Sequence, residues 1–141
     1  MKTRDIKQTE HFDASPKEIY DALMDSKKHT QFSGDTAKIE NKVGGSFSAF
    51  SGYATGKSLE LIPGKKIVQS WHAEEDNWPD DYFSKITFDL KDDKKGGTTM
   101  NFTHEGVPVD NADSIEDGWV TYYWEPLREM FEGSRFLLSS K

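Results

Sequence analysis

The chain has 141 residues, a formal net charge of −7 and no cysteine. A chain of this length can bury a core without cross-links, and the lack of cysteine excludes disulfides and thiolate metal ligands. The acidic balance argues against nucleic acid as a partner, because nucleic-acid binders present basic patches to phosphates. Aromatic residues make up 13% of the chain, so Phe, Trp and Tyr must supply much of the core.

Targeting and membrane signals are not evident in the sequence. No apolar run approaches the roughly 18 residues that a membrane span requires. The first five residues, Met1 to Asp5, lack an apolar signal core. We therefore expect a cytoplasmic protein with no membrane span, and, since no linker or repeat divides the chain, a single domain over residues 1–141.

The N-terminal segment predicts one strand followed by two short helices. Residues 6–12 can form the strand. A helix should then start at Ser15, because Ser15 can cap it and Glu18, three residues on, can complete a capping box. A second helical segment covers about residues 26–32 and should stop at Gly34.

Six strand-like runs separated by turn residues follow. They cover residues 36–40, 45–50, 53–62, 66–73, 82–90 and 98–105. The short links between them predict an antiparallel meander. Apolar residues alternate with polar ones in most of these runs, which predicts a sheet with one apolar and one wet face.

A long amphipathic helix is predicted over about residues 114–136. Its apolar face consists of Trp119, Tyr122, Tyr123, Pro126, Leu127, Met130 and Phe131. Such an aromatic face suits ordinary packing on a sheet, and it equally suits a wall around a bound molecule. Pro126 removes one backbone hydrogen bond, so we expect a kink near residues 122–125.

These elements together predict an α+β protein with a helix-grip fold. A curved antiparallel sheet of about six or seven strands would wrap around the long C-terminal helix, with two short helices after the first strand. This arrangement buries the apolar face of the sheet and that of the helix against each other.

Five short segments also occur in the order typical of one family. They are residues 15–20 (SPKEIY), 43–47 (VGGSF), 61–71 (LIPGKKIVQSW), 77–80 (NWPD) and 118–124 (GWVTYYW). The chain resembles the helix-grip superfamily that includes START lipid-transfer domains and polyketide cyclases. Within it, the chain is most similar to the family named after the activator of heat-shock protein 90 ATPase, specifically that activator's C-terminal domain.

The resemblance covers about residues 9–131 and has two departures. The chaperone activator carries an additional N-terminal domain that contributes to chaperone binding, and this chain has no room for one. Many superfamily members have Trp near the end of the second short helix, where this chain has Phe32. Since the fold hosts carriers, enzymes, receptors and co-chaperone domains, the resemblance alone does not fix the function.

The leading functional hypothesis is a small, largely apolar ligand held between the C-terminal helix and the sheet. The residues expected to line this cavity are Phe32, Phe47, Gln69, Trp71, Phe88, Phe102, His104, Trp119, Tyr123 and Met130. Ligand sites are typically concave and apolar with a few polar groups, a role that Gln69 and His104 would fill.

The histidines offer little for catalysis. None lies in a metal-binding motif, and we expect neither a metal nor a cofactor. His104 lies two residues after Phe102 in the same predicted strand, so its side chain should face the cavity as well. It is the best candidate for a general base; alternatively, it is a core histidine with its hydrogen bonds satisfied. His72 has the opposite parity to Trp71, so we expect it to face solvent.

Two further hypotheses remain open. In a co-chaperone-like protein, the outer sheet face and the loop containing Trp78 and Pro79 would contact an ATP-driven chaperone, although that loop can equally be a rigid turn. In a cyclase-type enzyme, His104 or a carboxylate would act in the cavity. Exposed sheet edges leave room for a homodimer.

Overall fold

The computed structural model describes the backbone of residues 1–139 and the side chains up to Glu132. The elements, in chain order, are β1 (Thr3–Phe12), α1 (Pro16–Met24), α2 (Ser26–Ser33), β2 (Lys38–Ile39), β3 (Ser46–Ala49), β4 (Ala54–Ile62), β5 (Lys66–Ala73), β6 (Ser84–Asp92), β7 (Thr98–Pro108), α3 (Val109–Trp119), the π-helical segment η1 (Val120–Trp124) and α4 (Glu125–Ser139).

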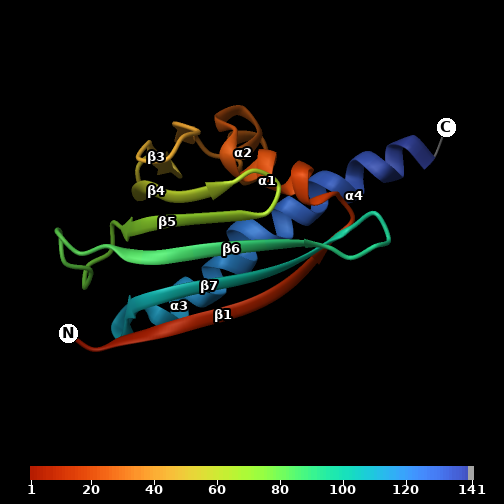
Figure 1. The fold of residues 1–141 in the computed structure, drawn as a ribbon. Helices are drawn as coiled ribbons and strands as arrows, with labels where there is room; N and C mark the ends of the chain where they lie inside the picture. The colour runs from red at the N-terminus through yellow and green to blue at the C-terminus, as the bar shows by residue number, and fades with distance from the viewer. Residues whose placement is uncertain (140–141) are drawn as a thin grey trace.

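One seven-stranded antiparallel sheet forms the frame of the molecule. Its strand order is β1-β7-β6-β5-β4-β3-β2, so six strands form a meander and β1 pairs with β7. The continuous helical segment α3–η1–α4 crosses behind the sheet, with α1 and α2 at one end (Figure 1). This confirms the predicted α+β helix-grip fold.

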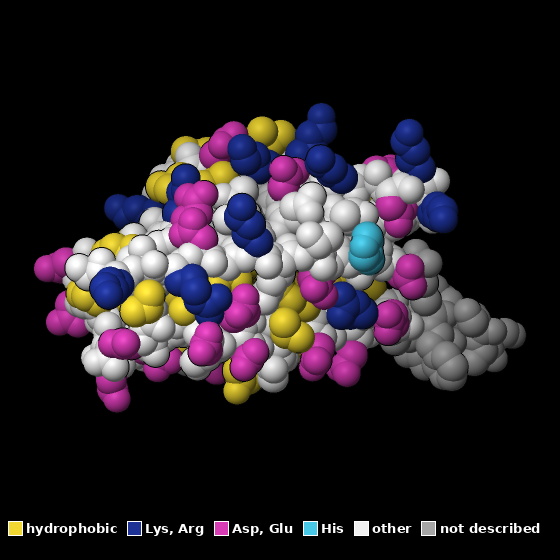
Figure 2. All heavy atoms as spheres, turned by 90° about the horizontal axis from the view of Figure 1, so that it is seen from below, with side chains coloured by type: hydrophobic (Ala, Val, Ile, Leu, Met, Phe, Trp, Pro, Cys, Tyr) yellow, Lys and Arg dark blue, Asp and Glu magenta, His cyan; other side chains and the backbone are white. Residues whose placement is uncertain are grey.

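The inner face of the sheet is apolar, as the alternation predicts. Its buried residues include Phe47, Ala49, Ile67, Gln69, Trp71, Ile86, Phe88, Leu90, Met100, Phe102 and His104. Gly56 lies where β4 and β5 pass close together, since an added Cβ there would collide with the carbonyl oxygen of Ser70. On the face seen in Figure 2, acidic and basic side chains are interspersed, so charge singles out no partner surface there.

The N-terminal helices begin and end where the sequence predicts. The hydroxyl of Ser15 accepts from the backbone N–H of Glu18, and the Glu18 carboxylate accepts from the N–H of Ser15. This capping box satisfies two backbone donors that the helix itself cannot pair. Helix α2 ends at Gly34, whose φ of 76° is the left-handed conformation that glycine adopts without strain.

The C-terminal helix differs from the prediction in two ways. It begins at Val109 rather than near Ser114, because the N–H of Val109 donates to the carbonyl of Lys2 (3.1 Å) and strand β7 runs directly into the helix. The distortion expected from Pro126 is present as η1, in which the N–H of Glu125 donates to the carbonyl of Val120. In the part of the chain described, no helix is long and apolar enough to cross a membrane.

Candidate functional site

The space between the helix and the centre of the sheet is filled. Phe47, Gln69, Phe88 and Tyr123 help to line a void there of only about 10 Å³, which is about the volume that a single water needs. Gln69, expected to orient a ligand, instead donates to the hydroxyl of Ser58 (3.2 Å). The cavity predicted at this place is therefore not present at the size of a small molecule.

His104 lies at the centre of a buried hydrogen-bond chain. The indole N–H of Trp119 donates to Nδ1 of His104 (3.0 Å), so Nδ1 carries no proton. Nε2 must then carry it and donate to the Ser84 hydroxyl (2.7 Å), which donates in turn to the carbonyl of Trp71 (2.9 Å). This chain links α3 to strands β7, β6 and β5.

Burial lowers the pKa of His104 to about 3, because the charged imidazolium would lose its hydration. His104 is fully buried and points to the inner face, as its parity predicts. Since both ring nitrogens already have partners, no nitrogen remains to take a proton from a substrate. Of the two interpretations offered by the sequence, the geometry agrees with the core histidine.

A second buried histidine, His29, joins the C-terminal helical segment to the N-terminal helices. Nδ1 of His29 donates to the carbonyl of Leu23 (3.1 Å), so Nε2 accepts from the hydroxyl of Tyr123 (3.1 Å). Burial lowers the pKa of His29 and raises that of Tyr123. These two bonds tie η1 to the N-terminal helices, and sequence reasoning did not identify His29.

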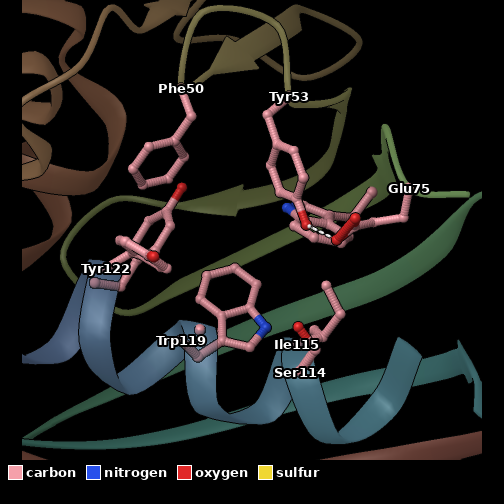
Figure 3. A pocket seen from close by; sticks show the side chains of 10 residues that line it. Phe50, Tyr53, Glu75, Ser114, Ile115, Trp119 and Tyr122 are labelled. Atoms are coloured by element: carbon pink, nitrogen blue, oxygen red, sulfur yellow. Dashed lines mark hydrogen bonds between the residues drawn. The ribbon is translucent and has the colours of Figure 1, made fainter. Parts of the chain in front are cut away.

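A larger opening lies at one end of the helix–sheet contact. We call it the Trp119 pocket; its cavity volume is about 370 Å³, and its lining residues are Phe50, Tyr53, Trp71, Glu75, Ser114, Ile115, Gly118, Trp119, Tyr122 and Tyr123. Phe50 and Tyr53 reach into it from above, opposite the side chains of the helix (Figure 3). The pocket falls within the usual range for small-molecule sites, roughly 300–1,000 Å³.

The hairpin between β3 and β4 that carries Phe50 has an unusual backbone. Phe50 and Ser51 have φ values of 53° and 55°, in the left-handed region that residues with a Cβ rarely adopt. Packing holds this conformation, since the Phe50 ring contacts those of Tyr122 (6.0 Å between centroids) and Tyr123 (5.5 Å). Such conformations cluster at functional sites.

The wall of the pocket beside Tyr53 carries a carboxylate. The hydroxyl of Tyr53 donates to Oε2 of Glu75 (2.9 Å; dashed line in Figure 3). A backbone hydrogen bond joins the same two segments, because the N–H of Glu74 donates to the carbonyl of Tyr53 (2.9 Å). Burial, together with the bond to Glu75, raises the pKa of Tyr53, so this phenol stays a donor to the carboxylate.

The loop containing Trp78 and Pro79, predicted to be either a partner surface or a rigid turn, holds its tryptophan inside the protein. Trp78 is buried, with its indole N–H donating to the carbonyl of Tyr82 (2.9 Å) and its ring against Trp71 (5.6 Å). Pro79 is exposed, as is Phe83 with 49% of its surface accessible. Trp78 thus anchors the loop, whose exposed aromatic residue is Phe83.

The expectation that His72 faces solvent is wrong. His72 does lie on the face opposite Trp71, but its side chain is buried. The loop after β5 covers it: Nδ1 donates to the carbonyl of Tyr82 (3.0 Å), and the ring contacts Phe83 (5.5 Å). The alternation along the strand predicted the correct face of the sheet for His72. Its burial depends on a loop that only the tertiary structure places over it.

The predicted lining set is divided among several places. Trp71, Trp119 and Tyr123 line the Trp119 pocket. Phe32 and Met130 line a separate, open cavity of about 380 Å³ between α2 and α4. Phe102 and His104 belong to the buried aromatic cluster.

Most residues of the Trp119 pocket were not predicted as lining. Tyr53 and Glu75 lie in two loops and Ser114 in α3, so no single periodic pattern joins them. The one available signal was the segment Phe-Ser-Gly-Tyr at residues 50–53, in which two aromatics flank a turn.

Comparison with known proteins identifies the family. The family model described as "Activator of Hsp90 ATPase homolog 1-like protein" matches residues 13–132. The chain belongs to this family. The match includes both short helices, six strands of the sheet and the C-terminal helical segment as far as residue 132.

Relatives of known name agree with this assignment. The chain is 32% identical over 132 residues to the activator of 90 kDa heat shock protein ATPase homolog of Dictyostelium discoideum, covering 94% of this chain and 34% of that protein. It is 30% identical over 122 residues to human homolog 1, covering 86% and 35%. The chain therefore spans about a third of the length of these curated relatives.

Solved structures share the fold. The crystal structure of an HSP90 activator from Plasmodium falciparum matches with a TM-score of 0.81 and 27% identity, over 92% of this chain and 96% of that one. The solution structure of the Aha1 dimer from Colwellia psychrerythraea matches with a TM-score of 0.74 and 23% identity, again over 92% and 96%.

The buried state of His104 predicts a specific pH dependence of stability. Because its pKa is about 3 in the folded protein against an ordinary 6.5, the unfolded chain binds more protons between these values. Stability should therefore fall as pH falls, and His104 alone should contribute a loss of roughly 2 kcal/mol between about pH 7 and pH 4.5. Denaturant unfolding at a series of pH values measures this loss.

The matched variants are His104→Gln and His11→Gln. Glutamine at 104 can accept and donate but does not titrate, so this variant should show a flatter pH dependence even if its stability is lower. His11 is exposed, so its replacement should leave the pH dependence unchanged. An unchanged slope in His104→Gln would contradict the account.

Proposed function

We propose that this chain is a chaperone-binding module that binds Hsp90 and stimulates its ATPase. The observation that carries the proposal is 30–32% identity, over 86–94% of the chain, to proteins named as activators of the 90 kDa heat shock protein ATPase. We also propose that residues 1–141 act as one domain.

The loop of residues 74–83 is the best candidate for the chaperone contact. It contains five acidic residues and no Lys or Arg. Its anchored Trp78 lies beneath, while Pro79 and Phe83 are exposed above it. An exposed aromatic with an acidic rim, held on a stiff sheet, is a common recognition element and fits a basic partner surface.

Small-molecule binding is a second candidate function, favoured by the Trp119 pocket. This pocket is concave and mainly aromatic, with a few polar groups. We do not propose catalysis, because His104 uses both ring nitrogens within the core. The possible homodimer through an exposed sheet edge stays a prediction.

The chaperone proposal predicts that the purified chain raises the ATP turnover of purified Hsp90. Phe83→Ala should require about tenfold more protein for half-maximal stimulation, since exposed aromatic anchors often dominate an interface. Leu59→Ala is the matched control, because Leu59 is similarly exposed (51%) but lies on β4. A coupled ATPase assay measures all three proteins.

If the wild-type chain neither changes the turnover nor forms a complex with Hsp90, the proposal is refuted. If both variants stimulate like the wild type, Hsp90 activation stands but the contact does not involve Phe83.

The small-molecule candidate predicts that filling the pocket abolishes binding. Gly118 lines the pocket, and a Cβ there would meet only Tyr122 at an ordinary 3.8 Å. Gly118→Leu should therefore occupy the space while favouring the helix, and should weaken binding of the neutral dye Nile red by about tenfold or more. Gly118→Ala should bind like the wild type. Equal dye binding by all three proteins, or none by the wild type, would contradict this candidate.

A further inference from the structure

The Trp119 pocket has a one-sided charge. Glu75 is the only charged residue among its ten lining residues, and none of them is Lys, Arg or His. Helix α3, which supplies four of the lining residues, carries four acidic residues and no basic one. Arg4 pairs with Asp113 (2.8 Å) and Glu116 (3.5 Å) and so offsets part of this charge. The surroundings of the pocket nevertheless favour a cation over an anion.

Aromatic rings form most of the wall. Six of the ten lining residues are aromatic. Several of these rings meet at steep angles, since Phe50 and Tyr122 are inclined by 71° and Tyr53 and Trp71 by 74°. Rings set edge to face make walls whose faces can point into an opening. The negative face of an aromatic ring attracts an organic cation, most strongly for Trp.

The Glu75 carboxylate is held in place by one hydrogen bond and can accept further ones. Glu75 receives one hydrogen bond within the pocket wall, from the Tyr53 hydroxyl. An ionised carboxylate has about four acceptor positions, so others remain for a donor on a guest. The Ser114 hydroxyl lies across the pocket (Figure 3) and adds a second polar group.

One polar atom of the wall has no partner. The indole N–H of Trp71 is buried and forms no hydrogen bond with the described residues. An unpaired buried donor costs about 1–3 kcal/mol, so native proteins rarely leave one unused. An oxygen acceptor on the guest would give this N–H a partner.

We propose that the Trp119 pocket binds a small organic cation, a protonated amine or quaternary ammonium group on a compact aromatic or apolar body that also carries an oxygen acceptor. The positive charge lies among the ring faces beside Glu75. This inference rests on the second candidate function and names the ligand class for that pocket. An anionic guest would face the Glu75 carboxylate unfavourably, and a neutral guest would leave that carboxylate partly desolvated without a counter-charge.

Three probes of nearly equal shape test the charge preference. Tyramine is a phenol with a protonated amine, 4-ethylphenol is its neutral analogue, and 4-hydroxyphenylacetate is an anionic analogue. Isothermal titration of the full chain should show tyramine binding about tenfold more tightly than 4-ethylphenol, with 4-hydroxyphenylacetate the weakest.

Variants then locate the bound charge. Glu75→Gln should weaken tyramine about tenfold and leave 4-ethylphenol nearly unchanged, because only the charge is removed. Glu74→Gln is the matched control: it removes the same charge from the adjacent residue, which does not line the pocket, and should bind tyramine like the wild type. Tyr122→Ala removes an exposed ring and should weaken tyramine severalfold without unfolding the protein.

Each outcome decides the proposal. If tyramine fails to bind, or binds no more tightly than 4-ethylphenol, the cation proposal is overturned. If Glu75→Gln and Glu74→Gln weaken tyramine equally, the charge is not bound in the pocket and the proposal is also overturned. Equal binding of tyramine and 4-ethylphenol that Gly118→Leu abolishes would still support a small-molecule site, and none of these results bears on the Hsp90 assay.

Discussion

The hydrogen bond from Trp119 to His104 is the interaction on which the rest of the structure depends. It joins the C-terminal helix to strand β7 where no water can substitute for either partner, because both side chains are buried. A buried donor or acceptor left unpaired is costly, so the neutral histidine and the indole hold each other in one orientation. Ser84 extends the constraint to two more strands.

Several features follow from this anchor. The Trp119 ring contacts those of Phe102 (4.5 Å), Tyr123 (4.6 Å) and Trp124 (5.5 Å), which closes the interior to about the volume of one water. Its other side is left as the wall of the Trp119 pocket. The π-helical segment η1 comes immediately after Trp119. Pro126, just beyond this segment, has no backbone N–H to donate within the helix. Segments of π-helix often occur at functional sites.

Periodicity and turn chemistry were sufficient to predict the elements and the faces of the sheet. The capping box at Ser15 and the alternation through Ile67, Gln69 and Trp71 are local patterns, and the structure agrees with them. The start of the C-terminal helix was mislocated because the partner of Val109 is Lys2, more than a hundred residues away in sequence. His72 was misjudged for the same kind of reason, since a loop covers it.

The candidate site was harder to predict than the fold. Whether the aromatic face of a helix encloses space or fills it depends on side-chain packing, which sequence spacing does not contain. The pocket also depends on the left-handed backbone at Phe50 and on the position of Glu75 in the loop that follows β5. Glu75 belongs to the loop of residues 74–83 that also carries Phe83, so the two proposed sites share one loop.

The most direct test of this account is the protonation state of His104 in the folded protein. A long-range proton–nitrogen NMR spectrum distinguishes the two neutral tautomers from each other and from the charged ring. At about pH 5, well below the ordinary histidine pKa, we expect a neutral ring with its proton on Nε2. A charged ring, or a proton on Nδ1, would mean that Trp119 does not donate to His104 and that the helix is not held as described.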